Sequence, residues 1–238
     1  MDASTRAFFD AGGRAPLHPA AQAAFDDAVS HGWADPRRLH REGRQARHLL
    51  DEARQSFAAA LGARTEEIHL THGHTSGLHT VIAATGGARR RVGSGVVASA
   101  VERAAVLAAA RHLDPGARPV QVDRYGRVDL DAWRAAVAVP GVALAALQHA
   151  NGEVGTLQPL DDAHHAAQAA GVPLVVDAGA SLGHVDVGQA WDVLAADPGD
   201  WGGPSGIGVL AVRSRVRTRP TGPDDEDPWA PGGVSVPA

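Results

Sequence analysis

The feature that most constrains the fold is a regular alternation of short apolar runs with segments of helical periodicity. The alternation is visible over 67–85, 93–113, 117–138, 141–171 and 172–183, and a last apolar strand is expected over 207–212. Two helices, over 17–31 and 40–61, are predicted ahead of it. Strands that alternate with helices of this length are joined by right-handed crossovers and form a mostly parallel sheet. The sequence therefore predicts an α/β fold.

Functional groups of such sheets gather at the carboxyl ends of the strands. This rule places the loops at 71–76, 149–155, 175–181 and 197–203 along one rim. In the first loop, free N–H groups at a helix N-terminus favour an anion such as phosphate, although capping of the helix by Thr75 or Ser76 explains the same residues. Asp177 follows an apolar run and is expected at the rim, as a functional carboxylate or as a turn residue.

Two residue types that support covalent chemistry are missing from the sequence. All 22 basic residues are arginine, and the chain has no cysteine. Lysine forms imines with aldehyde cofactors, whereas arginine stays protonated. The composition therefore excludes imine catalysis by a side chain, thiol nucleophiles, disulfides and thiolate metal sites.

Charge and hydropathy exclude further classes of function. The net charge of −5 argues against a nucleic-acid surface. No apolar run approaches the length that spans a membrane, so a soluble cytoplasmic protein without nucleic-acid or membrane partners is expected. Histidines are numerous, and His72 and His74 with rim aspartates could complete a metal site, but their spacing matches no strong zinc motif and no metal is predicted.

The order of the motifs resembles the large domain of cysteine desulfurases. These belong to the class V aminotransferase branch of the fold-type I pyridoxal-phosphate enzymes. The resemblance runs from about residue 7 to 213 and is most specific in HANGEVGTLQP (149–159) and GGPSGIGVL (202–210). It implies a three-layer α/β/α large domain over 1–213 without the family's small C-terminal domain. Residues 214–238 are expected to form an extended tail rich in proline, glycine and acid.

The resemblance implies that part of a cofactor site is kept. The threonine that grips the cofactor phosphate falls on Thr75, in a loop that includes His74, and the aspartate that pairs with the pyridine nitrogen falls on Asp177. His74, Thr75 and Asp177 are therefore the predicted cofactor-binding residues. Other positions differ: the family's stacking histidine falls on Arg103, and its aldimine lysine falls on Asp200.

Further positions depart from the family pattern. The asparagine near the ring hydroxyl falls on Gly152, a nearby glutamine on Ala180, and the threonine lent by a neighbouring subunit on Gly233. The persulfide cysteine and the arginine for the substrate carboxylate belong to a later part of the family's chain. We therefore predict no catalytic residues and no covalently bound cofactor. Binding of pyridoxal 5′-phosphate is left open only in a non-covalent form.

These observations favour a degenerate homologue that acts as a binding or regulatory partner. The expected assembly is a homodimer, or a heterodimer with a full-length desulfurase-like chain. One alternative is an enzyme with a repurposed cleft that uses His72 or His74, Asp177 and Asp200 for metal or acid–base chemistry. A second alternative is a decaying gene product without a selected role. A third is that the chain is a desulfurase-type protein by homology alone.

Overall fold

A six-stranded sheet forms the centre of the computed structural model, which describes residue 7, residue 10, residues 13–219, residue 222 and residues 227–237. The strand order is β1-β6-β5-β4-β3-β2. Neighbours are parallel from β2 to β5, whereas β6 is antiparallel to both β5 and β1. The strands are β1 (Ile68–Thr71), β2 (Gly95–Ala98), β3 (Val142–Gln148), β4 (Leu174–Asp177), β5 (Val193–Ala196) and β6 (Gly208–Val212).

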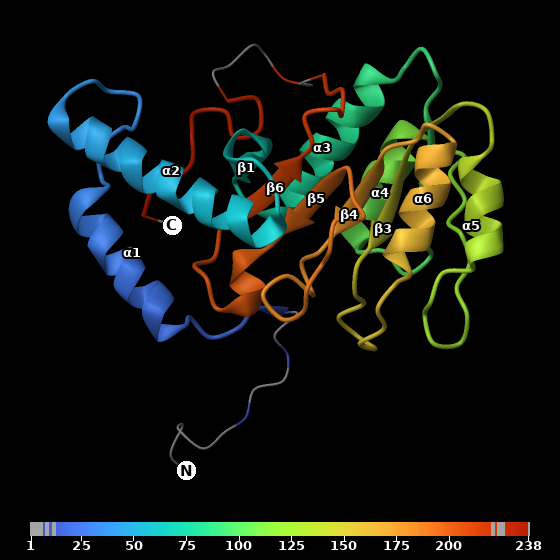
Figure 1. Cartoon of the computed structure of the whole chain (residues 1–238), viewed down its shortest axis with the longest axis horizontal. Coiled ribbons are helices and arrows are strands. Elements are labelled where there is room, and N and C mark those ends of the chain that lie inside the picture. The colour runs from blue at the N-terminus through green and yellow to red at the C-terminus, as the bar shows by residue number, and fades with distance from the viewer. Residues whose placement is uncertain (1–6, 8–9, 11–12, 220–221, 223–226, 238) are drawn as a thin grey trace.

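Helices cover both faces of the sheet and give three layers (Figure 1). One face packs against α3 and α4, and the other packs against α2, α5 and α6. The helices are α1 (Pro19–His31), α2 (Arg41–Leu61), α3 (His74–Ala88), α4 (Ala104–Leu113), α5 (Leu130–Val137) and α6 (Leu160–Ala169), with short 3-10 helices η3 (Thr65–Glu67) and η4 (Pro198–Trp201). The expected three-layer α/β/α architecture is confirmed.

The central strand β3 shows why continuous apolar runs suit this architecture. Side chains alternate between the faces of a strand. Leu144 accordingly joins the core under α3 and α4, while Leu147 joins the opposite core beside Trp133. All seven residues of β3 are buried, as expected for a strand covered on both faces.

The outer helices have the bounds that their sequence signals predict. In α2, Ala46 and Leu50 are buried one turn apart, and the helix ends at Gly62, which adopts the left-handed conformation with φ 54°. Helix α1 lies beside α2 at one side of the molecule and has no buried residue (Figure 1).

Two details differ from the prediction. Strand β5 is not predicted, because a four-residue run with two alanines carries little periodic signal. The segment 117–123 is expected to form a strand but makes only isolated bridges, from Val120 to Ser99 and from Val122 to Val128.

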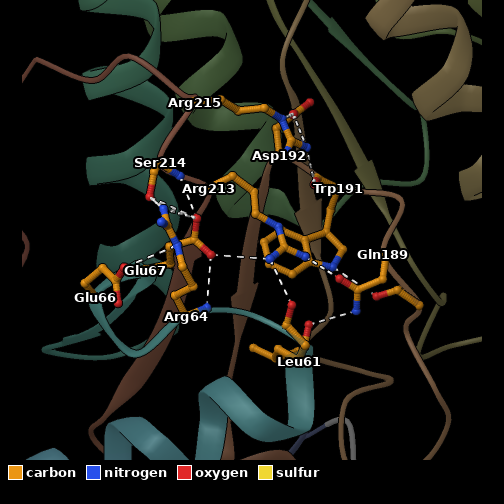
Figure 2. A network of polar contacts seen from close by, with 12 residues as sticks. Leu61, Arg64, Glu66, Glu67, Gln189, Trp191, Asp192, Arg213, Ser214 and Arg215 are labelled. Atoms are coloured by element: carbon orange, nitrogen blue, oxygen red, sulfur yellow. Dashed lines mark hydrogen bonds and ion pairs between the residues drawn. The ribbon is translucent and has the colours of Figure 1, made fainter.

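A polar cluster around Glu67 joins η3 to the segment that follows β6 (Figure 2). The buried Glu67 carboxylate accepts hydrogen bonds from the backbone N–H groups of Arg64 and Ser214 at 3.1 and 2.8 Å, and from Arg213 Nη1 at 3.3 Å. The Arg213 guanidinium also lies 3.7 Å above the ring of the fully buried Trp191. This cluster ties together segments that are almost 150 residues apart.

The described part of the C-terminal segment has neither helix nor strand, but it packs on the domain. Trp229 and Ala230 are buried, and the Trp229 ring lies 5.3 Å from that of His69. Gly233 lies in this segment with φ 83°. Among the described residues, no helix is long and apolar enough to cross a bilayer.

Candidate functional site

The candidate site lies at the carboxyl rim of the parallel strands. Gln148 ends β3 and is in register with Asp177 at the end of β4. The loop after β2 carries Glu102 and Arg103, and the loop after β5 carries Asp200. The rim rule for parallel sheets therefore holds for the side chains that form this site.

Asp177 is the most heavily contacted side chain of the site. Its carboxylate is 4% exposed. Oδ2 accepts a hydrogen bond from Arg103 Nε at 3.0 Å, and Oδ1 accepts one from the Gly179 N–H at 2.9 Å. His74 Nε2 lies 3.1 Å from Oδ1, but its geometry does not meet that of a hydrogen bond. Both oxygens of Asp177 are therefore engaged by groups of the protein itself.

Electrostatics keep Asp177 ionised. Burial by itself raises the pKa of the carboxyl, but the adjacent His74 ring, the Arg103 guanidinium and the Gly179 N–H outweigh it and hold the pKa below its usual value. The site thus has a fixed negative charge with its own counter-ion.

Asp200 lies on the other side of the same guanidinium. Its Oδ2 is 3.7 Å from Arg103 Nη2, and no hydrogen bond reaches that oxygen from the described residues. Asp200 lies in η4. Asp197 caps the N-terminus of this helix, since its Oδ1 accepts a hydrogen bond from the Gly199 N–H. Burial and the charge of Asp197 raise the pKa of Asp200 to about 6, despite Arg103. Arg103 therefore bridges two carboxylates.

Glu102 is a further buried acid. Oε1 accepts from Ser99 Oγ at 2.7 Å and from the Gln148 N–H at 2.8 Å, whereas Oε2 has no hydrogen-bond partner among the described residues. Burial raises the pKa of Glu102 to about 7, and the two hydrogen bonds offset only part of that effect.

Several of these side chains line one cavity of about 1080 Å³. Glu102, Gln148 and Asp177 form its buried part, and the partly exposed Arg103 lies beside them. Gly152 and Ala180, where the resemblance implies a family asparagine and glutamine, line the same cavity and offer no polar side chain.

The predicted cofactor-binding residues do not all converge. His74 contacts Asp177, which lines the cavity, whereas neither the buried His74 nor the exposed Thr75 lines it. The expected capping of α3 by Thr75 or Ser76 is wrong: the N-cap is Gly73 with φ 110°, and the Ser76 hydroxyl donates to the Gly73 carbonyl at 2.8 Å.

His72 and His74, the two histidines considered for a metal site, do not come together at the rim. Strand β1 ends at Thr71, so the two histidines do not alternate along a strand. His72 is exposed and its Nε2 lies 3.3 Å from the Pro231 carbonyl, while His74 contacts Asp177. Over the described ranges, no group of three histidine or acidic side chains is placed to hold a metal ion.

The sequence did not point to Glu102 as a site residue. It pointed to Arg103 only as the residue that replaces the family's stacking histidine. Their position in the loop that follows a strand at the rim is a signal that could have marked them. The pairing of Arg103 with Asp177, 74 residues away, has no local signal.

Gly179 allows Arg103 and His74 to approach Asp177 together. A Cβ on Gly179 would lie 2.7 Å from Arg103 Nη2 and 2.7 Å from His74 Cε1. We expect Gly179→Ala to displace both side chains and to lower the free energy of unfolding by about 1–3 kcal/mol, measured by urea denaturation. Gly152→Ala is the control, since its Cβ meets only Ala180 Cβ at 3.5 Å; equal losses in both variants would contradict the argument.

Comparison with known proteins identifies the fold. The structure superposes on a NifS-like protein with a TM-score of 0.90 at 23% identity, covering 98% of this chain and 66% of the other. It superposes on the apo cysteine desulfurase of Thermococcus onnurineus NA1 with a TM-score of 0.84 at 24% identity, covering 96% and 63%. The fold is therefore that of the fold-type I pyridoxal-phosphate enzymes.

The sequence comparisons narrow this class. Residues 7–236 match the aminotransferase class-V family, and the chain belongs to that family, in its cysteine desulfurase-like branch. It is 33% identical to a cysteine desulfurase of Cereibacter sphaeroides over 226 residues, covering 90% of this chain and 57% of the relative. It is 29% identical to cysteine desulfurase IscS 1 of Archaeoglobus fulgidus over 239 residues, covering 97% and 62%. The chain thus spans little more than half the length of these relatives.

Proposed function

We propose that this chain is a class-V aminotransferase homologue that does not catalyse the pyridoxal-phosphate reaction and acts instead as a binding or regulatory partner. The observation that carries the proposal is the pair formed by Asp200 and Arg103, which lie 3.7 Å apart where the resemblance implies the family's lysine and stacking histidine. A carboxylate cannot form an imine, and the chain has no lysine elsewhere.

The residues of the cleft do not fit the family's cofactor. Arg103 and Gly179 donate to the two oxygens of Asp177, so a pyridine nitrogen would have to share one of these oxygens with a donor of the protein. The buried Asp200 carboxylate adds negative charge to a cleft that would have to admit a phosphorylated aldehyde. Thr75, the residue expected at the phosphate, does not line the cavity. We therefore derive no catalytic step through pyridoxal phosphate.

The surface of the chain supports a protein partner. Helix α1 has no buried residue, and Val29, Trp33 and Leu39 are 48%, 69% and 86% exposed at and after its end. Exposed large apolar side chains that gather in one region are typical of interaction surfaces. The partner we propose is a second copy of this chain or a full-length desulfurase-like chain. The cytoplasmic location expected from the sequence is part of the same proposal.

A second candidate is acid–base chemistry in the same cleft. It is favoured by one observation, the buried contact between His74 Nε2 and Asp177 Oδ1 at 3.1 Å. Two observations count against it: Arg103 shares the carboxylate, and neither His72 nor His74 lines the cavity.

The test measures cofactor binding and assembly on the same protein. Equilibrium dialysis of the purified chain against pyridoxal phosphate is expected to show no saturable binding, and the absorbance spectrum is expected to show no imine. Sedimentation of the chain, alone and co-expressed with a full-length desulfurase-like chain from its own cell, is expected to show a dimer. A monomer in both samples, or cysteine desulfuration by the isolated chain, would refute the proposal.

A further inference from the structure

The cavity at the rim has an excess of negative charge. Its described lining includes four carboxyl groups, on Asp10, Glu102, Glu153 and Asp177, and one guanidinium, on Arg103. Asp10 and Glu153 are exposed and lie on the solvent side, while Glu102 and Asp177 lie on the buried side. The guanidinium is already committed to Asp177 and Asp200. The other carboxylates therefore face the cavity without a counter-ion from its described lining.

A second, independent observation points to a ligand. Glu102 is 6% exposed and lines the cavity, and its Oε2 has no hydrogen-bond partner in the described part of the chain. A buried acceptor without a donor is costly, since it has lost its hydration without compensation. The buried end of the cavity thus has an unsatisfied hydrogen-bond acceptor, Glu102 Oε2.

The chemistry of these groups selects the class of ligand. An anion would meet four carboxylates and, among the described lining residues, no uncommitted cation, so it is disfavoured by charge. A metal ion would need three or more converging ligands, and the described residues offer no such group. An organic cation has N–H donors that can satisfy Glu102, and its charge can be shared among carboxylates at several distances.

We propose that this cavity binds a small organic cation with a primary ammonium or guanidinium group, which donates to Glu102 Oε2 while a distal positive group lies near the exposed carboxylates Asp10 and Glu153. This inference rests on the proposed function in one respect: the cleft is not filled by pyridoxal phosphate. The proposed ligand is positively charged, whereas the family's cofactor carries a negatively charged phosphate.

The test is isothermal titration calorimetry at pH 8 with 1,4-diaminobutane as the probe and succinate as its dianionic counterpart. Wild-type protein is expected to bind the diamine saturably at one site and to show no binding of succinate. Glu102→Gln keeps the size of the side chain and the Oε1 acceptor for Ser99 and Gln148, and it is expected to weaken diamine binding about 10- to 100-fold, the effect of one buried charge-assisted hydrogen bond.

Two further variants separate the site from general effects. Glu153→Gln at the exposed side is expected to weaken binding only about two- to threefold, because solvent screens that charge. Asp131→Asn, whose side chain is 94% exposed on α5, is the control and is expected to leave binding unchanged. Absence of diamine binding, equal binding by Glu102→Gln, or succinate binding of similar affinity would overturn the proposal.

The outcomes also distinguish this inference from the proposed function. Saturable pyridoxal phosphate binding to the same sample would overturn the proposed function whatever the diamine result. If neither pyridoxal phosphate nor the diamine binds, only the proposed cation site is overturned. Folding of Glu102→Gln is checked by urea denaturation at pH 8, where removal of a buried ionised carboxyl is expected to leave the protein at least as stable as the wild type.

Discussion

Treatment with pyridoxal phosphate followed by borohydride is expected to label no side chain of this protein. The chain has no lysine, so the α-amino group of the polypeptide is the only amine that can form a reducible imine. The double variant Arg103→His/Asp200→Lys puts a histidine and an amine at the positions where the family resemblance implies them. We expect this variant to be labelled close to stoichiometrically at position 200, as peptide mass spectrometry would show.

A matched variant controls for accidental modification. Asp131→Lys adds one amine at an exposed position of α5 that does not line the cavity, and it is expected to be labelled much more slowly at equal reagent concentration. Labelling of a side chain in the wild type would contradict the chemistry proposed for the chain. Equal rates of labelling at positions 200 and 131 would show that more than two substitutions separate this cleft from a cofactor site.

Glu67→Gln is expected to lower the free energy of unfolding by about 2–4 kcal/mol. The carboxylate is buried and accepts hydrogen bonds from Arg64, Arg213 and Ser214, and the amide cannot balance two guanidinium charges or accept on both atoms (Figure 2). Urea denaturation at pH 7 measures the loss. Glu66→Gln is the control, because Glu66 is 65% exposed in its ion pair with Arg64 and is expected to contribute less than about 0.5 kcal/mol.

The same residue makes a prediction about acid stability. Burial alone would raise the pKa of Glu67, but the hydrogen bonds from Ser214 and Arg64 outweigh it and lower the pKa to about 2, from an ordinary value of 4.5. The stabilisation is therefore fully present above pH 4.5 and is lost as the pH falls towards 2. Denaturation curves at several pH values should show a smaller loss on acidification in Glu67→Gln than in wild type. Parallel losses in the two proteins would contradict the assignment.

The two classes of function proposed for the cleft differ in how they use Arg103. In a binding or regulatory protein, Arg103 serves as a permanent counter-ion for Asp177 and Asp200. In an acid–base enzyme, that guanidinium would have to leave Asp177 free to act with His74. The hydrogen bond from Arg103 Nε to Asp177 Oδ2 at 3.0 Å therefore favours the first class.

Much of the fold follows from sequence because its signals are local. The apolar positions of α2 recur at helical spacing, and a glycine ends the helix where a left-handed residue is needed. The run at β3 is apolar throughout, which is typical of a strand covered on both faces. Strand β5 escapes prediction since its stability comes from pairing with β4 and β6, and not from any pattern of its own.

The features of the site likewise fall into those that the sequence determines and those that only the tertiary structure decides. The sequence alone determined that no side chain can form an imine, because that conclusion needs only the absence of lysine. The rim rule placed Asp177 and Asp200 in one region without any contact being known. Only the tertiary structure decided that Arg103 lies between them, that His72 turns away, and that Glu102 is buried with an oxygen that no described residue contacts by a hydrogen bond. Those facts depend on side chains brought together from distant strands, where burial and charge act through space and leave no trace in local periodicity.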